Sequence, residues 1–289
     1  MTTTAKSNAT APSNPTAPPN TISDTTGSSA GALLAAGHAP LRVALRAIAV
    51  IAQRDLLRQV KRPGVLASQL VQILFFVLVY AVGFDGMIGA VDGAPFSAYV
   101  FPGIIAIQVV SIGVASGQTY AWDREYGVLR ELLVAPVPRV CLPLGKVVAG
   151  AGMVTVQSAV MLAFAPLMGV TLTPARFAAA VGCYGLAAVV FSVIGLCLAT
   201  VIKRVQTLQA TVQMAMFPML FLSGSVFSPQ DAPAWLTAAM YLNPMTYAVD
   251  LARQTLLGGA GLLPWWADLG ALGLILAAVL ALLRIRSGR

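Results

Sequence analysis

The side chains that could perform chemistry in this chain are few, and its charged residues gather most densely between Asp123 and Arg139. This stretch reads DREYGVLRELLVAPVPR and holds six formal charges between two long apolar runs. The spacing predicts a short amphipathic helix ended by prolines, formed by Glu125, Gly127 and Leu129 to Leu133 and followed by Pro136 and Pro138. Such a helix would face water and could transmit force to the apolar runs on either side. The alternative is a solvated loop with incidental charges.

No other motif in the sequence supports catalysis. Leu144 to Val147 contains a Gly-Lys pair but lacks the Ser or Thr and the earlier glycine of a phosphate-binding loop, so ATP binding by that route is not expected. The single histidine, His38, lies in a polar tail, and Cys141, Cys183 and Cys197 lack metal-ligand spacing. We therefore expect no metal site, no disulfide and no enzymatic activity.

The composition is that of a membrane protein. Of the 289 residues, 58% are hydrophobic and only 10% are charged, and the mean hydropathy is +0.82. Soluble domains carry about 25% charged residues. We expect an all-α polytopic protein with about six spans of roughly 20 residues each. The net charge of +8 does not indicate nucleic-acid binding, because Lys and Arg cluster at the ends of apolar runs.

The first residues divide into a tail and a helix. Residues 1–40 are rich in Thr, Ser, Ala, Pro and Asn, which predicts a disordered cytoplasmic tail, and they lack the pattern of a signal peptide. Residues 41–64 predict an amphipathic helix lying on the anionic cytoplasmic leaflet, with basic side chains at Arg42, Arg46, Arg54 and Arg58.

Residues 65–289 predict a transmembrane domain of six helices. The spans are expected at about Val65–Phe84, Ala98–Tyr120, Leu142–Met168, Phe177–Ile202, Leu208–Phe227 and Leu262–Leu283. A short acidic loop, Asp85 to Asp92, and a long proline-containing segment, Ser228 to Gly261, would connect them on the outer side. Of the 18 Lys and Arg residues, all but Arg176 and Arg253 then fall on the side of the termini. This bias predicts that both termini are cytoplasmic.

Uncharged polar residues recur within the spans, whereas ionisable ones are missing at mid-depth. That absence indicates that energy for transport does not come from an intramembrane ion site. Gln206, Gln209 and Gln213 form one stripe on the fifth span. Polar groups in lipid face protein or a cavity, so the stripe either makes interhelical hydrogen bonds or lines a translocation path. The same holds for Gln69 and Gln72, Gln108 and Ser111, and Thr155 and Ser158.

The charged stretch resembles the cytoplasmic signature of ABC type-2 permeases, roughly E-R-E-x-G-T-L-E-x-L-L-V-T-P-V-S-R. The chain matches it at Arg124, Glu125, Gly127, Leu129, Leu132, Leu133, Val134, Pro136, Val137 and Arg139. It departs at Arg130-Glu131, among other positions. The segment before the last span is similar to the family's outer segment as well, at Pro233, Trp235, Asn243, Pro244 and Tyr247. The resemblance is closest to the daunorubicin-resistance exporter subfamily.

This resemblance implies the permease subunit of an ATP-driven exporter in the inner (plasma) membrane, which moves an amphipathic drug-, polyketide- or lipid-like substrate. A separate ABC ATPase subunit, carrying ATP and Mg, would dock on a coupling helix and on the interfacial helix. The coupling residues would be Arg124, Glu125, Gly127, Leu129, Leu132, Leu133, Pro136 and Arg139. A second permease subunit, identical or related, would complete the path, and the outer segment would form short re-entrant helices.

Two other functions stay open at this point. One is a stand-alone secondary drug efflux transporter, driven by an ion gradient. The other is a membrane-embedded enzyme or assembly factor, for which the sequence offers no catalytic constellation.

Overall fold

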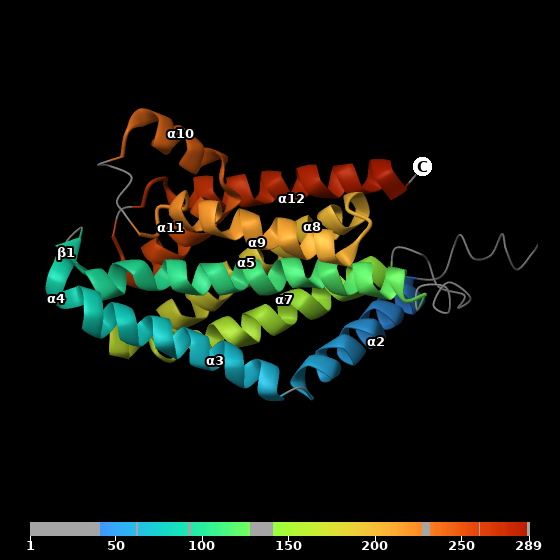
Figure 1. Cartoon of the computed structure of the whole chain (residues 1–289), viewed down its shortest axis with the longest axis horizontal. Coiled ribbons are helices and arrows are strands. Elements are labelled where there is room, and N and C mark those ends of the chain that lie inside the picture. Colours follow the sequence, from blue (N-terminus) through green and yellow to red (C-terminus); the bar gives the residue numbers. More distant parts are fainter. Residues whose placement is uncertain are drawn as a thin grey trace, which may run out of the picture. The chain divides into compact units, whose positions relative to one another are not determined.

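The computed structural model describes residues 41–61, 63–91, 94–127, 141–226, 232–259 and 261–287. The predicted tail, residues 1–40, and most of the predicted coupling helix lie outside them. The described chain is almost entirely helical (Figure 1). Its helices are α2 (Leu41–Val60), α3 (Pro63–Leu78), α4 (Asp85–Ile88), α5 (Phe96–Glu125), α7 (Cys141–Leu162), α8 (Pro174–Val201), α9 (Val205–Phe221), α10 (Ala234–Leu242), α11 (Pro244–Leu257) and α12 (Trp265–Ser287).

Helices occupy all six predicted spans, but they differ in length. Among the described residues, α5, α7, α8 and α12 are long and apolar enough to cross a membrane. The first predicted span is divided into α3, with 16 residues, and a π-helix, η2 (Val79–Phe84), which continues it without a break. The fifth corresponds to α9, which has 17 residues. The chain is therefore a polytopic α-helical protein with four candidate spans.

The predicted acidic loop after the first span is wrong in detail. Asp85 begins the short helix α4, and Ala90–Val91 (β1) pairs antiparallel with Ala94–Pro95 (β2). The backbone N–H of Phe96 donates to the carbonyl of Gly89 at 3.1 Å, which closes this hairpin onto the start of α5. Backbone hydrogen bonds, which hydropathy does not register, thus order a segment that looked like a loop.

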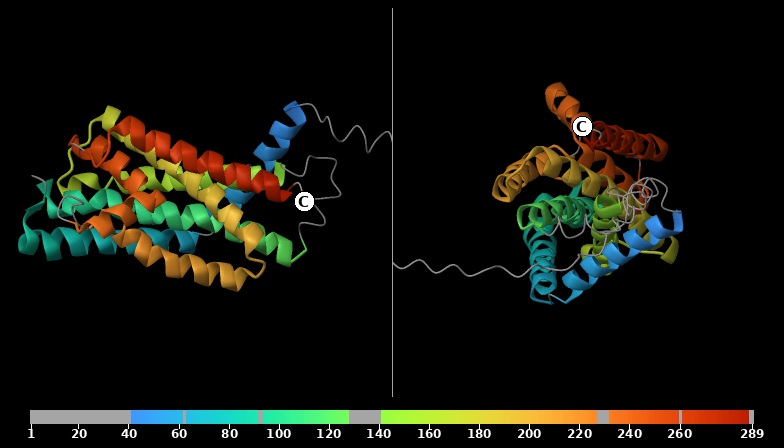
Figure 2. Two further views of the ribbon diagram at one scale, coloured as in Figure 1. Left: turned by 90° about the horizontal axis from the view of Figure 1, so that it is seen from above. Right: turned by 90° about the vertical axis from the view of Figure 1, so that its right-hand side faces the viewer.

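The helix ends fall into two groups. Figures 1 and 2 show α2, the end of α5, the α8–α9 junction and the end of α12 at one end, and α4, β1 and α10 at the other. The first end carries most of the basic residues, including Arg54, Arg58, Lys203 and Arg204. Arg176 lies in the first turn of α8, far from the α8–α9 junction, and Arg253 belongs to α11. This grouping agrees with the charge asymmetry expected of a membrane protein.

Helix α5 forms the centre of the packing and contacts α7, α8, α9 and α11. Its closest approach is to α8, where small residues let the two backbones meet. A Cβ atom added at Gly117 would lie 2.0 Å from the carbonyl oxygen of Gly195, and one at Gly195 would lie 2.6 Å from that of Val114. A hydrogen bond adds to this contact, because Ser116 Oγ donates to the backbone carbonyl of Ser192 at 3.3 Å.

We expect Gly117→Ala to destabilise the protein by about 1–3 kcal/mol, because the added methyl group forces α5 and α8 apart. The matched control is Gly182→Ala on α8, where an added Cβ meets nothing within 4 Å. Thermal unfolding of the two purified variants in detergent measures the difference. Equal midpoints for both would show that the close approach does not contribute to stability.

Helix α2 lies where the sequence predicts a helix after the tail, and it ends at Val60, shortly before Pro63 begins α3. It packs on α7. Ala52 is buried, and a Cβ added at Gly145 would lie 2.7 Å from Ile51 Cγ2. Arg46 and Arg58 are exposed on the same helix. α2 therefore buries one face against the protein, and its placement on a lipid surface stays a prediction.

Candidate functional site

The charged stretch begins inside α5 rather than after it. The second span was expected to end near Tyr120, but α5 continues to Glu125. Gly127 then has φ +79°, a left-handed conformation that favours glycine and breaks the helix. The prediction of one helix running from Glu125 through Gly127 to Leu133 is therefore wrong. The coupling residues Leu129, Leu132, Leu133, Pro136 and Arg139 lie outside the described residues.

Arg124 holds the end of α8. Its guanidinium donates to the carbonyl oxygens of Ala199 at 2.8 Å, Ile202 at 3.1 Å and Lys203 at 2.9 Å. The last carbonyls of a helix lack intrahelical partners and form the negative end of its dipole. An arginine fork suits them, because it offers five donors in one plane. Arg124 is therefore half-buried, with its guanidinium hydrogen-bonded to the end of α8.

Glu125 is exposed and lies beside the start of α9. Its Oε2 accepts a hydrogen bond from the backbone N–H of Val205 at 3.4 Å. The residue at the N-cap of α9, Arg204, makes no side-chain capping bond. A carboxylate near a helix N-terminus is favourable because that end is positive. Arg124 thus complements the negative C-terminal end of α8, and the next residue, Glu125, complements the positive N-terminal end of α9.

A buried ion cluster joins α2, α5 and α7, and sequence reasoning missed it. Lys146 Nζ lies 3.2 Å from Asp55 Oδ2 and 2.7 Å from Asp123 Oδ2, and the lysine side chain is only 2% exposed. The contact with Asp123 is electrostatic, since that oxygen makes no hydrogen bond among the described residues. Asp55 also pairs with Arg54 at 3.0 Å. The only sequence signal was a lysine in the second turn of an apolar helix, without a visible partner.

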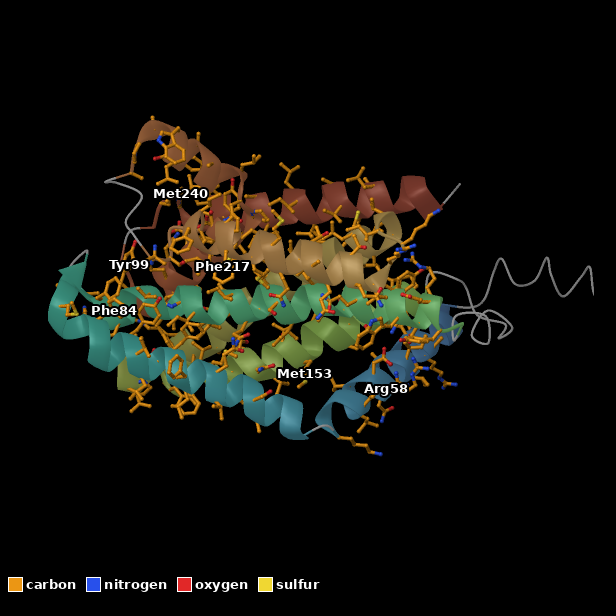
Figure 3. All side chains as sticks on the ribbon, viewed as in Figure 1. Arg58, Phe84, Tyr99, Met153, Phe217 and Met240 are labelled. Atoms are coloured by element: carbon orange, nitrogen blue, oxygen red, sulfur yellow. The ribbon has the colours of Figure 1, made fainter. Side chains whose placement is uncertain are left out.

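A cavity of about 310 Å³ lies between α3 with η2, α5 and α9. Three aromatic side chains and several aliphatic ones line it, together with five uncharged polar residues, and none of the described lining residues is charged. The polar members are Gln72, Gln108, Ser111, Gln213 and Ser225, and the aromatic members are Phe76, Tyr80 and Phe217. Figure 3 labels Phe217 on α9. Sites for small molecules are typically apolar with a few polar groups, at about 300–1,000 Å³.

The glutamine stripe faces away from the packed side of α9. Gln206, Gln209 and Gln213 are all exposed, whereas Val205, Leu208 and Val212 bury the opposite side. Gln213 reaches the cavity wall. Within the described part of the chain, these amides make no hydrogen bond to another helix. Interhelical hydrogen bonding among the described residues therefore does not explain the stripe.

The predicted outer segment forms two short helices, α10 and α11, that hold the far end of α9. Asn243 caps α11 by accepting from the N–H of Met245 at 3.0 Å, and its amide donates to Met219 O at 2.7 Å. Thr246 Oγ1 donates to Leu222 O at 3.1 Å. Pro233 and Pro244 stand at the starts of the two helices, where a missing N–H costs nothing. Trp235 is exposed and Tyr247 half-buried, so these two do not join the contacts to α9.

Arg253 and two aspartates complete this end of the molecule. Arg253 donates to Gly224 O at 2.8 Å and lies 4.0 Å from the ring centroid of Tyr99, which Figure 3 labels on α5. Asp250 accepts from the N–H groups of Leu262 and Leu263, and Gln254 donates to both Asp250 and Asp268. These polar contacts join α11 to α12. Among the described residues no group of His, Cys, Asp and Glu could hold a metal ion.

Comparison with known proteins identifies the family. Residues 46–257 match the ABC-2 type transporter domain. The chain belongs to the ABC-2 type transporter family. Relatives of this ABC-2 protein include Escherichia coli (strain K12) YbhR, named "Probable multidrug ABC transporter permease", which is 30% identical over 186 residues covering 62% of this chain and 49% of YbhR. The "Daunorubicin resistance ABC transporter permease protein DrrB1" of Streptomyces coeruleorubidus is 25% identical over 223 residues, 74% of this chain and 76% of DrrB1.

A third relative is the Escherichia coli (strain K12) "Inner membrane transport permease YhhJ", 27% identical over 193 residues, 64% of this chain and 51% of YhhJ. This ABC-2 chain thus spans about half the length of YbhR and YhhJ. The matched domain extends from α2 to the end of α11. It includes the ion cluster, the contacts of Arg124 and Glu125, the cavity and the outer segment. These features all belong to the family domain of an integral membrane protein.

Proposed function

We propose that this ABC-2 protein is the membrane-spanning permease subunit of an ATP-driven exporter. The observation that carries the proposal is the uncharged, aromatic-lined cavity between α3, α5 and α9. Such a lining suits an amphipathic substrate of drug, polyketide or lipid type, because it offers apolar surface and a few hydrogen-bonding groups but no fixed charge. The names of YbhR and DrrB1, which refer to multidrug transport and daunorubicin resistance, support this class.

The arrangement in the membrane follows from the same proposal. Helix α3 with η2, together with α9, would complete six spans, and both termini would lie in the cytoplasm of a multi-pass inner (plasma) membrane protein. The basic end formed by α2, the α8–α9 junction and the end of α12 supports that orientation. The name of YhhJ places that relative in the inner membrane.

Two partners belong to the proposal. A separate ABC ATPase, which would carry ATP and Mg, docks at the basic end, on α2 and on the segment that follows Gly127. A second permease subunit, identical or related, covers the face around the cavity. Exposed apolar side chains on α3 and α9 support such an interface, because exposed apolar patches mark interaction sites. They are Phe75, Met214, Phe217 and Phe221.

Reconstitution tests the function. The chain is co-expressed with a candidate ABC ATPase from the same organism, purified and placed in liposomes, and uptake of daunorubicin is measured with and without ATP. We expect uptake that needs ATP and disappears when the ATPase lacks its catalytic carboxylate. Uptake by the chain alone under an ion gradient would instead support the secondary transporter, the second candidate.

The glutamine stripe gives a prediction about substrate choice. We expect Gln206→Leu/Gln209→Leu/Gln213→Leu to change the relative transport of polar and apolar drugs while leaving the abundance of the protein unchanged, because the amides make no contact that holds the described chain together. Transport of a panel of drugs, normalised to the protein in the membrane, measures this. Loss of folded protein with unchanged preference would contradict it and assign the stripe to packing.

A further inference from the structure

The last turn of α5 contacts three other helices through three consecutive residues. Asp123 pairs with Lys146 of α7, Arg124 binds carbonyls at the end of α8, and Glu125 binds the first N–H of α9. The guanidinium of Arg124 is largely occupied by these carbonyls. It is therefore not free to serve a partner as an exposed cation. The helix ends immediately beyond, at the left-handed Gly127.

The contacts of Arg124 depend on the shape of its side chain. Two nitrogens reach three carbonyl oxygens over 2.8–3.1 Å. A lysine would keep the positive charge, but its single ammonium group cannot reproduce a planar fork. The contact of Glu125 depends on an acceptor instead. A glutamine would keep an oxygen for the N–H of Val205 and lose only the charge.

Helix α9 is held by polar contacts at both of its ends. Glu125 holds its first residue, and at the other end Asn243 and Thr246 bind the carbonyls of Met219 and Leu222. The wall of the cavity lies between these two attachments, at Gln213, Met216 and Phe217. A displacement of the end of α5 would therefore reach the cavity wall through α9.

We propose that Arg124 and Glu125 are positioning residues that fasten the α8–α9 junction to the end of α5, so that a displacement of the end of α5 shifts α9 and the cavity wall. This inference rests on the proposed ATP-driven export. It differs from the expectation drawn from the sequence, in which both residues contact the ATPase directly. Positioning depends on the shape and the hydrogen-bonding atoms of the two side chains, whereas ionic docking on the ATPase depends on their charge.

Conservative variants of the permease–ATPase complex separate the two roles. If the two residues act by positioning, we expect Arg124→Lys to lower ATP-dependent daunorubicin transport by at least roughly tenfold. This corresponds to the loss of one charge-assisted hydrogen bond of about 1.4 kcal/mol. We expect Glu125→Gln to stay within about twofold of wild type, and Glu125→Ala to fall as Arg124→Lys does, because only alanine removes the acceptor. The ATPase should co-purify with all three variants.

Arg204→Gln serves as the matched control, since Arg204 is an exposed cation at the same junction that makes no capping bond with its side chain. Hydrogen exchange of the permease alone, over residues 202–208, adds a readout that needs no ATPase. Exchange should quicken in Glu125→Ala and not in Glu125→Gln. If Arg124→Lys does not fold, the comparison of Glu125→Ala with Glu125→Gln still distinguishes positioning from ionic docking.

The opposite pattern overturns the inference. Normal transport by Arg124→Lys, with loss of ATPase co-purification in Glu125→Gln, would assign both residues to ionic docking. Equal exchange in the two Glu125 variants would show that the bond to Val205 does not hold the junction. If the wild-type chain binds no ATPase and transports nothing with ATP, the proposed function fails, and the role in coupling fails with it.

Discussion

Lys146→Met is expected to lower the free energy of unfolding by about 3–5 kcal/mol, because it leaves buried carboxylates without their cation. The lysine side chain is 2% exposed, and the side chains of Asp55 and Asp123 are 12% and 11% exposed. Methionine fills similar space, so the loss arises from charge rather than from a cavity. Thermal or denaturant unfolding of the purified chain in detergent measures it.

The same cluster supplies a control and a rescue. Lys203→Met removes an exposed lysine at the same end of the molecule and should change stability by no more than about 0.5 kcal/mol. Asp55→Asn/Asp123→Asn/Lys146→Met should recover part of the loss, since no unpaired charge is then buried. A Lys146→Met variant as stable as Lys203→Met would show that the cluster does not hold α2 to α5 and α7.

The positions of the helices were largely predictable, because a helix that spans lipid needs a long apolar run, and such a run is visible in the sequence. The starts of α5, α7, α8 and α12 lie within about three residues of expectation. The end of α5 was not predictable from hydropathy. Asp123, Arg124 and Glu125 look like the start of a loop, yet they remain helical because each finds a partner on another helix.

The candidate site was predictable in kind but not in arrangement. Uncharged polar residues in spans were expected to face protein or a cavity, and Gln72, Gln108, Ser111 and Gln213 do line one cavity. The sequence could not show that three separate helices bring them together. Nor could it show that Lys146 has two carboxylate partners, because Asp55 and Asp123 are distant in the chain. Ion pairs of this kind depend on tertiary packing and leave no local pattern.

Ser111→Trp is expected to lower transport by at least about tenfold while basal ATP hydrolysis and membrane abundance stay near wild type, because an indole ring fills much of the path. Ser111 is a half-buried residue of α5 that lines the cavity. The cavity is about 310 Å³, so any large addition takes it below the size of typical small-molecule sites. The aromatic rings of Phe76, Tyr80 and Phe217 can pack against the new ring, and the glutamine carbonyls in the lining offer acceptors for the indole N–H.

The matched control for this variant is Val156→Trp, which adds the same side chain at a 61% exposed position of α7. We expect it to transport daunorubicin normally, since a tryptophan on an apolar outer surface blocks nothing. If Ser111→Trp and Val156→Trp transport daunorubicin equally well, the cavity is not part of the translocation path. Loss of transport in Ser111→Trp alone, with the ATPase still bound, would place the substrate between α3, α5 and α9, next to the wall that α9 contributes.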